Sequence, residues 1–412
     1  MVSVWGIPAS MRTSVLILGH HRQSLTVVRS LARAGFAVII GSAAGRPALA
    51  SSRFVSELWM HPPTQAEEFV TAFVDLLRGR RDIAYVFPVG ESELACLMRH
   101  HATAAAYSTI VMPKPAVVSR CLDKATTYQI VSRLGIPAPK TEGAKDLFEL
   151  LERARDVRFP CIVKPRTSLQ RFYDRKAIVC RTQAELIAAF ADWPEAGTAV
   201  LVQEFVNGAR YNCEFAAVNG RLIEYFEHKV LRSDRADELG VEVEGVSVPP
   251  TRVLVDYCER LLVELDYSGV GCVQFLVDES GRAVSFLEVN PRLDATCALP
   301  WHFGCDLPRV AVEIAAGKAR VAGPAPAAYP IAKRIHWCSG DLAGFMHEVR
   351  RGTLRLGAAL TWLTRIAISS LRADCHLTWW WKDPIPSFVL YRDLFMTWLS
   401  RLARRGEPLR VR

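Results

Sequence analysis

The sequence predicts an α/β protein with a Rossmann-like front domain, a second α+β domain and a basic, mostly helical C-terminal appendage. Strand-like and helical runs alternate at the start of the chain, which is typical of a parallel sheet with helices on its faces. A β-hairpin is indicated near residue 280, and six of the ten Trp residues lie between Trp337 and Trp398. We place the domains at residues 1–112, 113–325 and 331–412.

The composition limits the number of domains and excludes several classes of protein. Half of its 412 residues are hydrophobic, which is enough for two or three domains with substantial cores. No apolar run is long enough to cross a bilayer, and the N-terminus lacks the order of a signal peptide. Eleven Cys residues without a Cys-x-x-Cys pair favour neither a disulfide framework nor a zinc site. We therefore expect a cytoplasmic protein.

The first elements predict a parallel sheet. Residues 14–21 form a buried-strand run, residues 24–36 have helical periodicity, and residues 37–42 form a second strand. Gly19 stands alone at the first turn, without a G-x-G-x-x-G motif, so a dinucleotide site is not supported. Glu91 follows a later strand, at the edge where open α/β sheets collect ligands. It is either an ordinary first-turn acid or a substrate-site residue.

A β-hairpin follows in the second domain. Strand-like residues 272–277 and 283–289 flank the turn signal at residues 278–281. Because side chains alternate along a strand, Glu288 and Asn290 share one face of the second strand. We therefore expect them to converge with a polar residue of the first strand.

That residue is Gln274. One carboxylate and two amide oxygens, from Glu288, Gln274 and Asn290, form a hard-oxygen set that suits Mg²⁺. Arg292, just beyond, would hold a phosphoryl group or a carboxylate. The alternative is a surface hairpin whose polar side chains are merely solvated.

The segment FLEVNPRL, with a Gln one strand earlier, resembles the metal-binding hairpin of ATP-grasp ligases, in the branch of carbamoyl-phosphate synthetase and the carboxylate–amine ligases. The resemblance covers residues 14–320. It implies a pre-ATP-grasp domain at 1–112, walling the substrate cleft, and an ATP-grasp fold at 113–325 with subdomains of about 113–203 and 204–325. It also implies ATP and Mg²⁺ as cofactors, with Mn²⁺ as an alternative metal.

Two lysines match the nucleotide half-sites of that family. Lys124 lies on the first turn of a helix that Asp123 begins or caps. Lys164 lies at a strand end, where an ammonium group is unusual. The resemblance implies that Lys124 contacts the phosphates and that Lys164 contacts the α-phosphate and adenine. The family's Gly-rich phosphate loop is missing, so side chains such as Arg166 and Ser168 would take its place.

The next strands carry the remaining nucleotide candidates. By resemblance, Glu204 and the backbone of Phe205 and Val206 would bind near the adenine edge. Asn219-Gly220 is a strong hairpin signal, and Glu214 on the preceding strand either binds the ribose or is solvated.

A basic cluster is expected on the strand after that turn. His228, Lys229 and Arg232 would neutralise the triphosphate or an acyl-phosphate. Otherwise they form a charged edge that guards against aggregation.

Together these observations predict an ATP- and Mg-dependent ligase that joins a small-molecule carboxylate to an amine through an acyl-phosphate. Arg292, Lys229 and His228 are the expected catalytic residues. Little covalent chemistry is required of the protein, so no nucleophilic Ser or Cys is needed. The alternatives are a phosphotransferase and a non-catalytic ATP-binding scaffold.

The C-terminal segment carries fourteen Lys and Arg against six Asp and Glu, which accounts for most of the net charge of +9. Interleaved aromatic and basic residues suit packing or homodimerisation, and they suit peripheral contact with a membrane at its cytoplasmic face. No nucleic-acid-binding motif is present, so we expect no nucleic acid partner.

Overall fold

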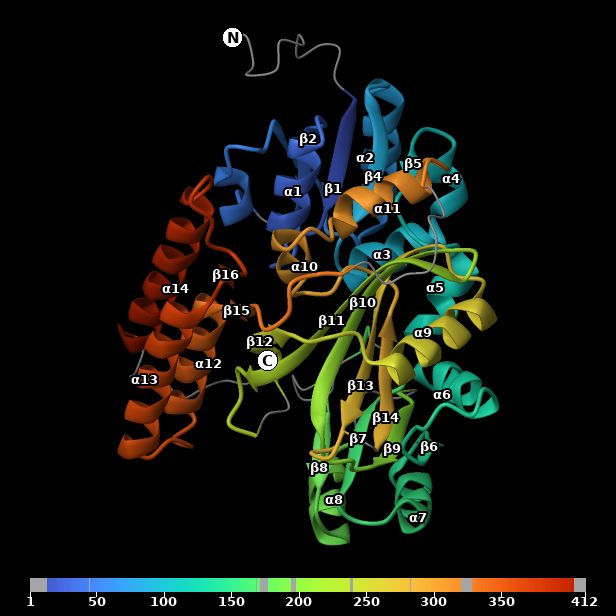
Figure 1. Cartoon of the computed structure of the whole chain (residues 1–412), viewed down its shortest axis with the longest axis vertical. Helices are drawn as coiled ribbons and strands as arrows, with labels where there is room; N and C mark the ends of the chain where they lie inside the picture. The colour runs from blue at the N-terminus through green and yellow to red at the C-terminus, as the bar shows by residue number, and fades with distance from the viewer. Residues whose placement is uncertain are drawn as a thin grey trace.

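A computed structural model describes residues 13–403 except 44, 168, 171–176, 194–197, 238–239, 282 and 320–327. In this part of the chain the strands form three sheets. The front domain lies at one end of the molecule, the two sheets of the second domain extend away from it, and the C-terminal helices lie along one side (Figure 1).

The front domain contains a five-stranded parallel sheet in the order β3-β2-β1-β4-β5. Every residue of β1 is buried, as expected for a parallel sheet covered on both faces. The predicted Rossmann-like arrangement is confirmed. Its elements are β1 (Ser14–Leu18), α1 (Ser24–Arg33), β2 (Ala37–Ser42), η2 (Ala48–Ser51), β3 (Glu57–Met60), α2 (Glu67–Gly79), β4 (Ile83–Pro88), α3 (Glu91–Arg99), α4 (His101–Ala105) and β5 (Thr109–Ile110).

A four-stranded antiparallel sheet in the order β6-β9-β7-β8 follows. The aliphatic faces of α7 and α8 pack on it and form a separate hydrophobic core. The elements are α5 (Pro115–Leu122), α6 (Lys124–Arg133), β6 (Thr141–Ala144), α7 (Leu147–Val157), β7 (Cys161–Pro165), β8 (Ile178–Cys180), α8 (Gln183–Phe190) and β9 (Val200–Glu204).

The largest sheet has seven strands in the order β14-β13-β10-β11-β12-β15-β16. Its predicted hairpins are confirmed. At the β10–β11 turn Asn219 and Gly220 both have positive φ, of 49° and 76°. A Cβ at Gly220 would lie 2.6 Å from Val263 Cα, so the turn also requires glycine for space. The elements are β10 (Ala209–Val218), β11 (Arg221–Ser233), β12 (Glu242–Ser247), α9 (Arg252–Leu265), β13 (Gly269–Val277), β14 (Val284–Asn290), α10 (Ala298–His302), α11 (Leu307–Ala315), β15 (Arg334–His336) and β16 (Cys375–His376).

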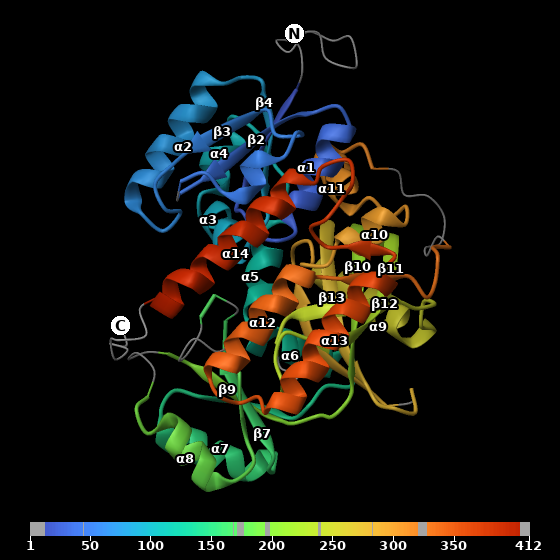
Figure 2. The same ribbon diagram turned by 90° about the vertical axis from the view of Figure 1, so that its left-hand side faces the viewer.

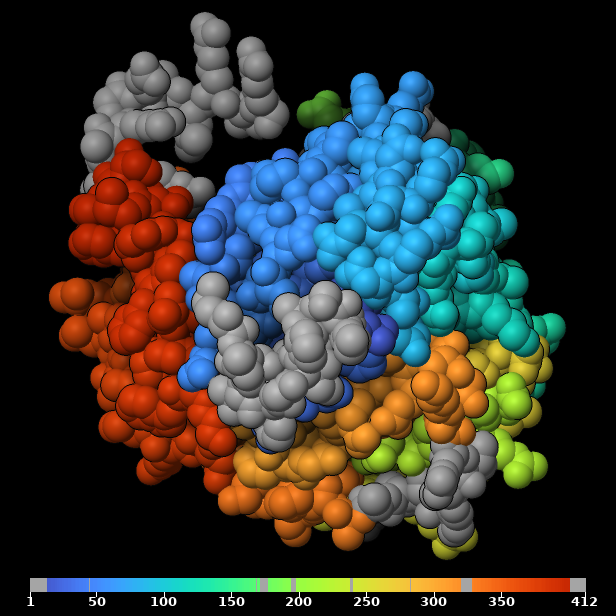
Figure 3. Space-filling view, turned by 90° about the horizontal axis from the view of Figure 1, so that it is seen from above, coloured from blue at the N-terminus to red at the C-terminus, as the bar shows by residue number. Residues whose placement is uncertain are grey.

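The C-terminal segment, which the sequence predicts as an appendage from residue 331, is joined to the rest of the chain by strand pairing and by a buried ion pair. Its strands β15 and β16 extend the large sheet, and its helices are α12 (Cys338–Arg350), α13 (Leu356–Arg372) and α14 (Ile385–Ala403). These helices form an outer layer in Figure 2 and lie beside the front domain in Figure 3. Asp383 forms a buried ion pair with Arg29 of α1 at 3.0 Å.

None of the described helices combines the length and the apolar character that crossing a bilayer requires.

Candidate active site

A row of polar side chains crosses four strands of the large sheet. Strand register places Glu288 opposite Gln274, Gln274 opposite Asn212, and Asn212 opposite His228. Directly opposed residues on antiparallel strands project to the same face. The hairpin and the adjoining strands β10 and β11 therefore present one continuous polar surface.

The three predicted metal ligands lie together on this face. Asn290 is one row further along than Glu288, and its Nδ2 donates a hydrogen bond to Glu288 Oε1 at 3.1 Å. Gln274 and Asn290 are buried, whereas Glu288 is half-buried. A carboxylate with two amide oxygens fits a hard divalent cation such as Mg²⁺. No group of three His, Cys, Asp or Glu side chains is placed to hold a metal elsewhere in the described ranges.

Lys164 links the small sheet to this hairpin. Its Nζ donates to the hydroxyl of Tyr128 at 2.8 Å, and that hydroxyl donates to the Leu287 carbonyl of β14 at 2.6 Å. Burial lowers the pKa of Lys164 to about 8, against the opposing effect of the Glu288 carboxylate. Lys164 is therefore a buried cation close to the predicted metal ligands.

The N-terminus of α6 collects the other basic candidates. Asp123 caps the helix, accepting hydrogen bonds from Ala125 N at 3.0 Å and Thr126 N at 3.3 Å, as predicted. The Lys124 backbone N–H donates to the Arg166 carbonyl at 3.0 Å, so these two candidates are adjacent. The Arg166 guanidinium forms an ion pair with Asp123 at 2.7 Å. This ion pair fixes the position of Arg166 beside the helix terminus.

The other residues expected to contact the nucleotide either follow β9 or lie outside the described part of the chain. Ser168 and residues 171–176 lie outside the described residues. Glu204, Phe205 and Val206 follow β9, where the chain passes from the small sheet to the large one. The Phe205 N–H donates to the Pro160 carbonyl at 3.3 Å, and the Glu204 side chain is exposed. Their adenine role remains a prediction.

The structure does not bring the predicted basic cluster together. His228 faces the polar row, whereas Lys229 lies on the opposite face of β11 because adjacent strand residues alternate. Lys229 Nζ lies 5.9 Å from the ring centroid of Tyr211. Arg232 forms ion pairs with Glu244 and with Asp341 of α12. Of the three, His228 is the one that lies in the site.

Carboxylates surround His228. Its Nε2 lies 3.2 Å from Glu242 Oε2, and its Nδ1 lies 3.6 Å from Glu214 Oε1. Burial alone would lower the pKa of His228, but Glu242, Glu214 and Asp294 outweigh it and raise this pKa to about 9. Burial, reinforced by Asp294, raises the pKa of Glu214 well above its usual range. His228 and Glu214 therefore hold their protons more tightly than exposed groups of the same kind would.

Buried polar atoms without a hydrogen-bond partner are concentrated here. Among the described residues nine such side-chain atoms occur, and six belong to this cluster. They are both carboxylate oxygens of Glu214, Asn212 Oδ1, Glu242 Oε1, His228 Nδ1 and Arg292 Nε. Because buried polar groups are ordinarily satisfied, this concentration marks a place where water, an ion or a polar ligand supplies the missing partners.

Arg292 connects the hairpin to the front domain. Its Nη2 donates to Glu91 Oε1 at 2.6 Å, and its Nη1 donates to the Leu293 carbonyl at 3.0 Å. Burial opposes the charge of Arg292, but the Glu91 carboxylate more than compensates and raises its pKa. Glu91 begins α3 at the carboxyl edge of the front sheet. This contact agrees with the expectation that the front domain walls the site.

Arg22, Glu242 and Asp294 also belong to the site and were not identified from the sequence. Arg22 lies in the loop after β1. Its Cζ is 4.4 Å from the centroid of the Trp337 ring, and its Nη1 donates a hydrogen bond to the Glu242 carbonyl at 3.3 Å. Asp294 accepts hydrogen bonds from the backbone N–H and the hydroxyl of Thr296. The run His20-His21-Arg22 at a strand end was an available signal for Arg22, whereas Glu242 and Asp294 had none.

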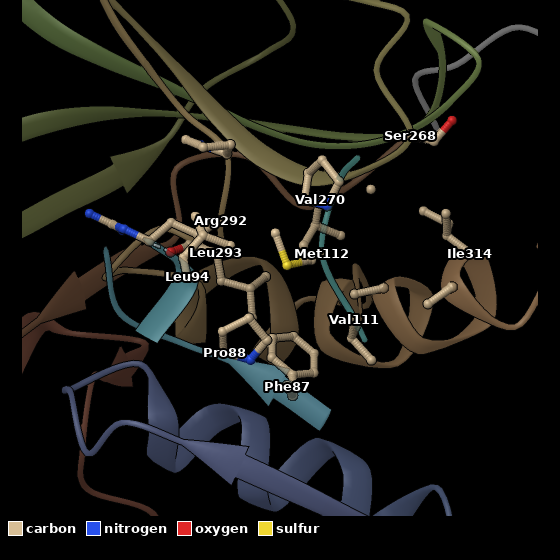
Figure 4. Close-up of a pocket in the computed structure, with 15 residues that line it drawn as sticks. Phe87, Pro88, Leu94, Val111, Met112, Ser268, Val270, Arg292, Leu293 and Ile314 are labelled. Atoms are coloured by element: carbon tan, nitrogen blue, oxygen red, sulfur yellow. Dashed lines mark hydrogen bonds between the residues drawn. The ribbon is translucent and has the colours of Figure 1, made fainter. Parts of the chain in front are cut away.

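Each of two cavities is lined by one candidate site residue, Arg292 in the first and Arg166 in the second. One of about 30 Å³ is lined mainly by apolar side chains of the front domain, the hairpin and α11; Figure 4 shows the Arg292 guanidinium turned away from them. A larger hollow of about 1240 Å³ lies along α6, β6 and β9, and none of its lining residues comes from the large sheet. Neither cavity contains the predicted metal ligands.

Comparisons with known proteins agree with this arrangement. Residues 123–320 match the family model for the ATP-binding domain of the carbamoyl-phosphate synthase L chain. The carbamoyl phosphate synthase large chain of Pyrococcus furiosus is 26% identical over 214 residues, 48% of this chain and 20% of that protein. Pyruvate carboxylase of Schizosaccharomyces pombe is 24% identical over 222 residues, 50% of this chain and 18% of that one. The match thus spans about one fifth of these relatives.

Solved structures with the same fold cover more of the chain. The biotin carboxylase domain of Hydrogenobacter thermophilus 2-oxoglutarate carboxylase aligns with a TM-score of 0.62 at 18% identity, covering 76% of this chain and 71% of that one. L-amino acid ligase from Bacillus licheniformis aligns with a TM-score of 0.60 at 12% identity, covering 75% and 77%. The sequence match over residues 123–320 and the shared fold both support the expected ATP-grasp fold for this part of the chain.

Proposed function

We propose that the protein is an ATP-dependent ligase that joins a small-molecule carboxylate to an amine through an acyl-phosphate. The observation that carries this proposal is the adjacency of two sets of residues on one sheet face. The hard-oxygen set around Glu288 lies next to the buried, unsatisfied cluster around Glu214. The first set suits a metal–nucleotide complex, and the second suits a polar substrate.

The nucleotide would lie between the two sheets of the second domain. Lys124 and Lys164 would hold its phosphates. Lys124 Nζ lies 3.5 Å from the Pro165 carbonyl at the end of β7, and Lys164 Nζ contacts the Tyr128 hydroxyl, which bonds to β14. Gln274, Glu288 and Asn290 would hold Mg²⁺, or alternatively Mn²⁺. When bound, such an ion neutralises charge on the phosphates and orients them.

In the first step a carboxylate oxygen of the substrate bonds to the γ-phosphorus, while the bond from that phosphorus to the bridging oxygen breaks and ADP departs. Negative charge spreads over the transferring phosphoryl group. Arg292 would balance that charge. Its buried guanidinium is already oriented by Glu91, so little reorganisation is required.

In the second step the amine nitrogen attacks the acyl carbon, phosphate departs, and the nitrogen loses its proton. We assign the amine to the Glu214 end of the site, because both carboxylate oxygens of Glu214 are buried without a hydrogen-bond partner and would accept hydrogen bonds from an ammonium group. A cationic ammonium group bound there would favour the ionised form of Glu214. That carboxylate, whose pKa is raised, would then be a stronger base than an exposed one.

This placement bears on the earlier expectation for Glu214. Strand register puts Glu214 opposite Cys272, which in turn lies opposite Asn290. It is therefore one row beyond the Gln274–Glu288 pair, toward Arg292 and away from the β9 end where the adenine is expected. A substrate role agrees better with that position than a ribose contact does.

The test is ADP and phosphate release by the purified protein with Mg²⁺ and ATP, across a panel of carboxylates with and without amines. Release that requires both partners would support the ligase. Release with a carboxylate alone would favour a phosphotransferase, and tight ATP binding without release would favour a scaffold.

Two variants test the proposed metal site and the proposed amine site separately. Glu288→Gln should reduce ATP turnover by at least about 100-fold, because a carboxylate ligand is lost from the metal site. Glu214→Gln should raise KM for the amine while leaving the ATP affinity within about twofold. Undiminished turnover in Glu288→Gln would show that the metal assignment is wrong.

A further inference from the structure

The outer face of the C-terminal helices exposes an unusual amount of apolar surface. Among the described residues twenty-one large hydrophobic side chains are exposed, and thirteen of them lie within residues 349–399. We call the exposed side chains of this range the outer helical face. Its apolar members are Val349, Leu356, Leu360, Leu363, Ile368, Leu371, Trp381, Ile385, Phe388, Phe395, Met396, Trp398 and Leu399.

On α13 these side chains form a stripe that points away from the protein. At 3.6 residues per turn, Leu356, Leu360, Leu363 and Leu371 fall within roughly 80° of one another. Leu356 and Leu371 are 79% and 86% exposed. The side chains of α13 that are buried are Ile366 and Ser369. The usual arrangement, in which the apolar stripe of a surface helix faces the core, is therefore reversed.

The exposed part of α14 repeats this arrangement. Ile385, Phe388, Phe395, Met396 and Leu399 fall within roughly 100° around the helix axis. Figure 2 shows α12, α13 and α14 together in one outer layer of the molecule. Helix α12 contacts both α13 and α14, so the two apolar stripes belong to neighbouring helices. Apolar side chains exposed in this number on a folded chain mark an interaction surface.

The charged residues of the same range determine which partner fits. Its basic side chains are all exposed: Arg350, Arg351, Arg355, Arg365, Arg372, Lys382 and Arg392. Two of its three acids are engaged elsewhere, since Asp374 binds Lys333 and Asp383 is buried on Arg29. The third, Asp393, pairs with Arg392 of the same range. The range therefore carries a net positive charge, and on α13 Arg365 and Arg372 lie roughly 140–160° around the helix axis from the middle of the apolar stripe, as in a helix with one apolar and one basic side.

We propose that the outer helical face binds the surface of an anionic lipid bilayer. Leucine, phenylalanine and tryptophan side chains enter the boundary between headgroups and acyl chains, and the arginines contact lipid phosphates. A second copy of the chain is a poorer partner, because a symmetric contact would bring the basic residues of the two copies together. The proposal is independent of the reaction assigned to the site.

The experiment is co-sedimentation of the full-length protein with phosphatidylcholine vesicles, with and without phosphatidylglycerol as the anionic lipid. We expect binding that requires the anionic lipid and weakens as salt rises, because exposed charges are screened. Absence of binding to anionic vesicles would overturn the proposal.

Two variants on the outer helical face separate its two components. The double substitution Arg365→Gln and Arg372→Gln should weaken binding by roughly 25-fold, on the basis of about fivefold for each arginine at an anionic surface. Leu363→Ser with Phe388→Ser should weaken binding at every salt concentration, because apolar burial is not screened.

The matched controls lie on α7, whose Phe148 is 79% exposed and whose Arg153 and Arg155 are also exposed. Phe148→Ser, and Arg153→Gln with Arg155→Gln, should leave binding unchanged. Sedimentation velocity without lipid covers the rival partner. A dimer that the α13 and α14 variants dissociate, with no vesicle binding by wild type, would instead assign this face to a second copy.

Discussion

Lys164 provides a prediction in which stability and nucleotide affinity change in opposite directions. Burial lowers the pKa of this lysine from 10.5 to about 8. At pH 7 the side chain is charged in both the folded and the unfolded state, so folding carries the full cost of burying the charge. That difference in pKa corresponds to roughly 3 kcal/mol. The hydrogen bond from Nζ to Tyr128 returns about 1 kcal/mol.

Lys164→Met should therefore raise the free energy of unfolding of the second domain by about 2 kcal/mol at pH 7. For a domain of this size we expect the melting temperature to rise by roughly 4–8 °C. ATP affinity should fall by about 10- to 100-fold, since a charged contact to phosphate contributes roughly 1.5–3 kcal/mol. Differential scanning calorimetry and isothermal titration calorimetry measure the two effects.

The pH dependence gives a further check. Between pH 8 and 10.5 the folded protein has lost the Lys164 proton while the unfolded chain still holds it, so wild-type stability rises across this range. The advantage of Lys164→Met should shrink accordingly. Lys145→Met, at an exposed position, should change stability by no more than about 0.5 kcal/mol. Unchanged melting together with unchanged ATP affinity would refute both the buried charge and the nucleotide contact.

Two further predictions concern buried charges. Asp383→Asn should lower the free energy of unfolding by about 3–5 kcal/mol, because it leaves Arg29 as an uncompensated buried charge; urea unfolding measures this, and an equal loss in the exposed Asp393→Asn would contradict it. The stabilisation from His228 should be complete below about pH 6.5 and be lost as pH rises through about 9, because its carboxylate neighbours raise its pKa. Urea unfolding of His228→Gln and wild type at pH 6 and pH 9.5 should show a smaller gap at the higher pH, and a gap that does not change would show that the ion pairs do not stabilise the fold.

Local sequence patterns were sufficient for the elements that carry the metal and nucleotide candidates. Alternation along a strand is determined by backbone geometry, so Glu288 and Asn290 had to share a face. The cap by Asp123 and the turn at Asn219-Gly220 depend on a few neighbouring residues. The same alternation would have separated His228 from Lys229, and that signal was available in the sequence.

Other features depend on long-range contacts that no local pattern encodes. Glu242 and Asp294 come from distant parts of the chain, and they meet His228 because the strands and loops that carry them are brought together by folding. The C-terminal strands join the large sheet through hydrogen bonds whose partners depend on the whole topology. Burial also determines the charge state of Lys164 and Glu214, and it arises only when the sheets pack. The sequence by itself thus determined the elements and the ligand types, whereas the tertiary structure decided which charges are buried together.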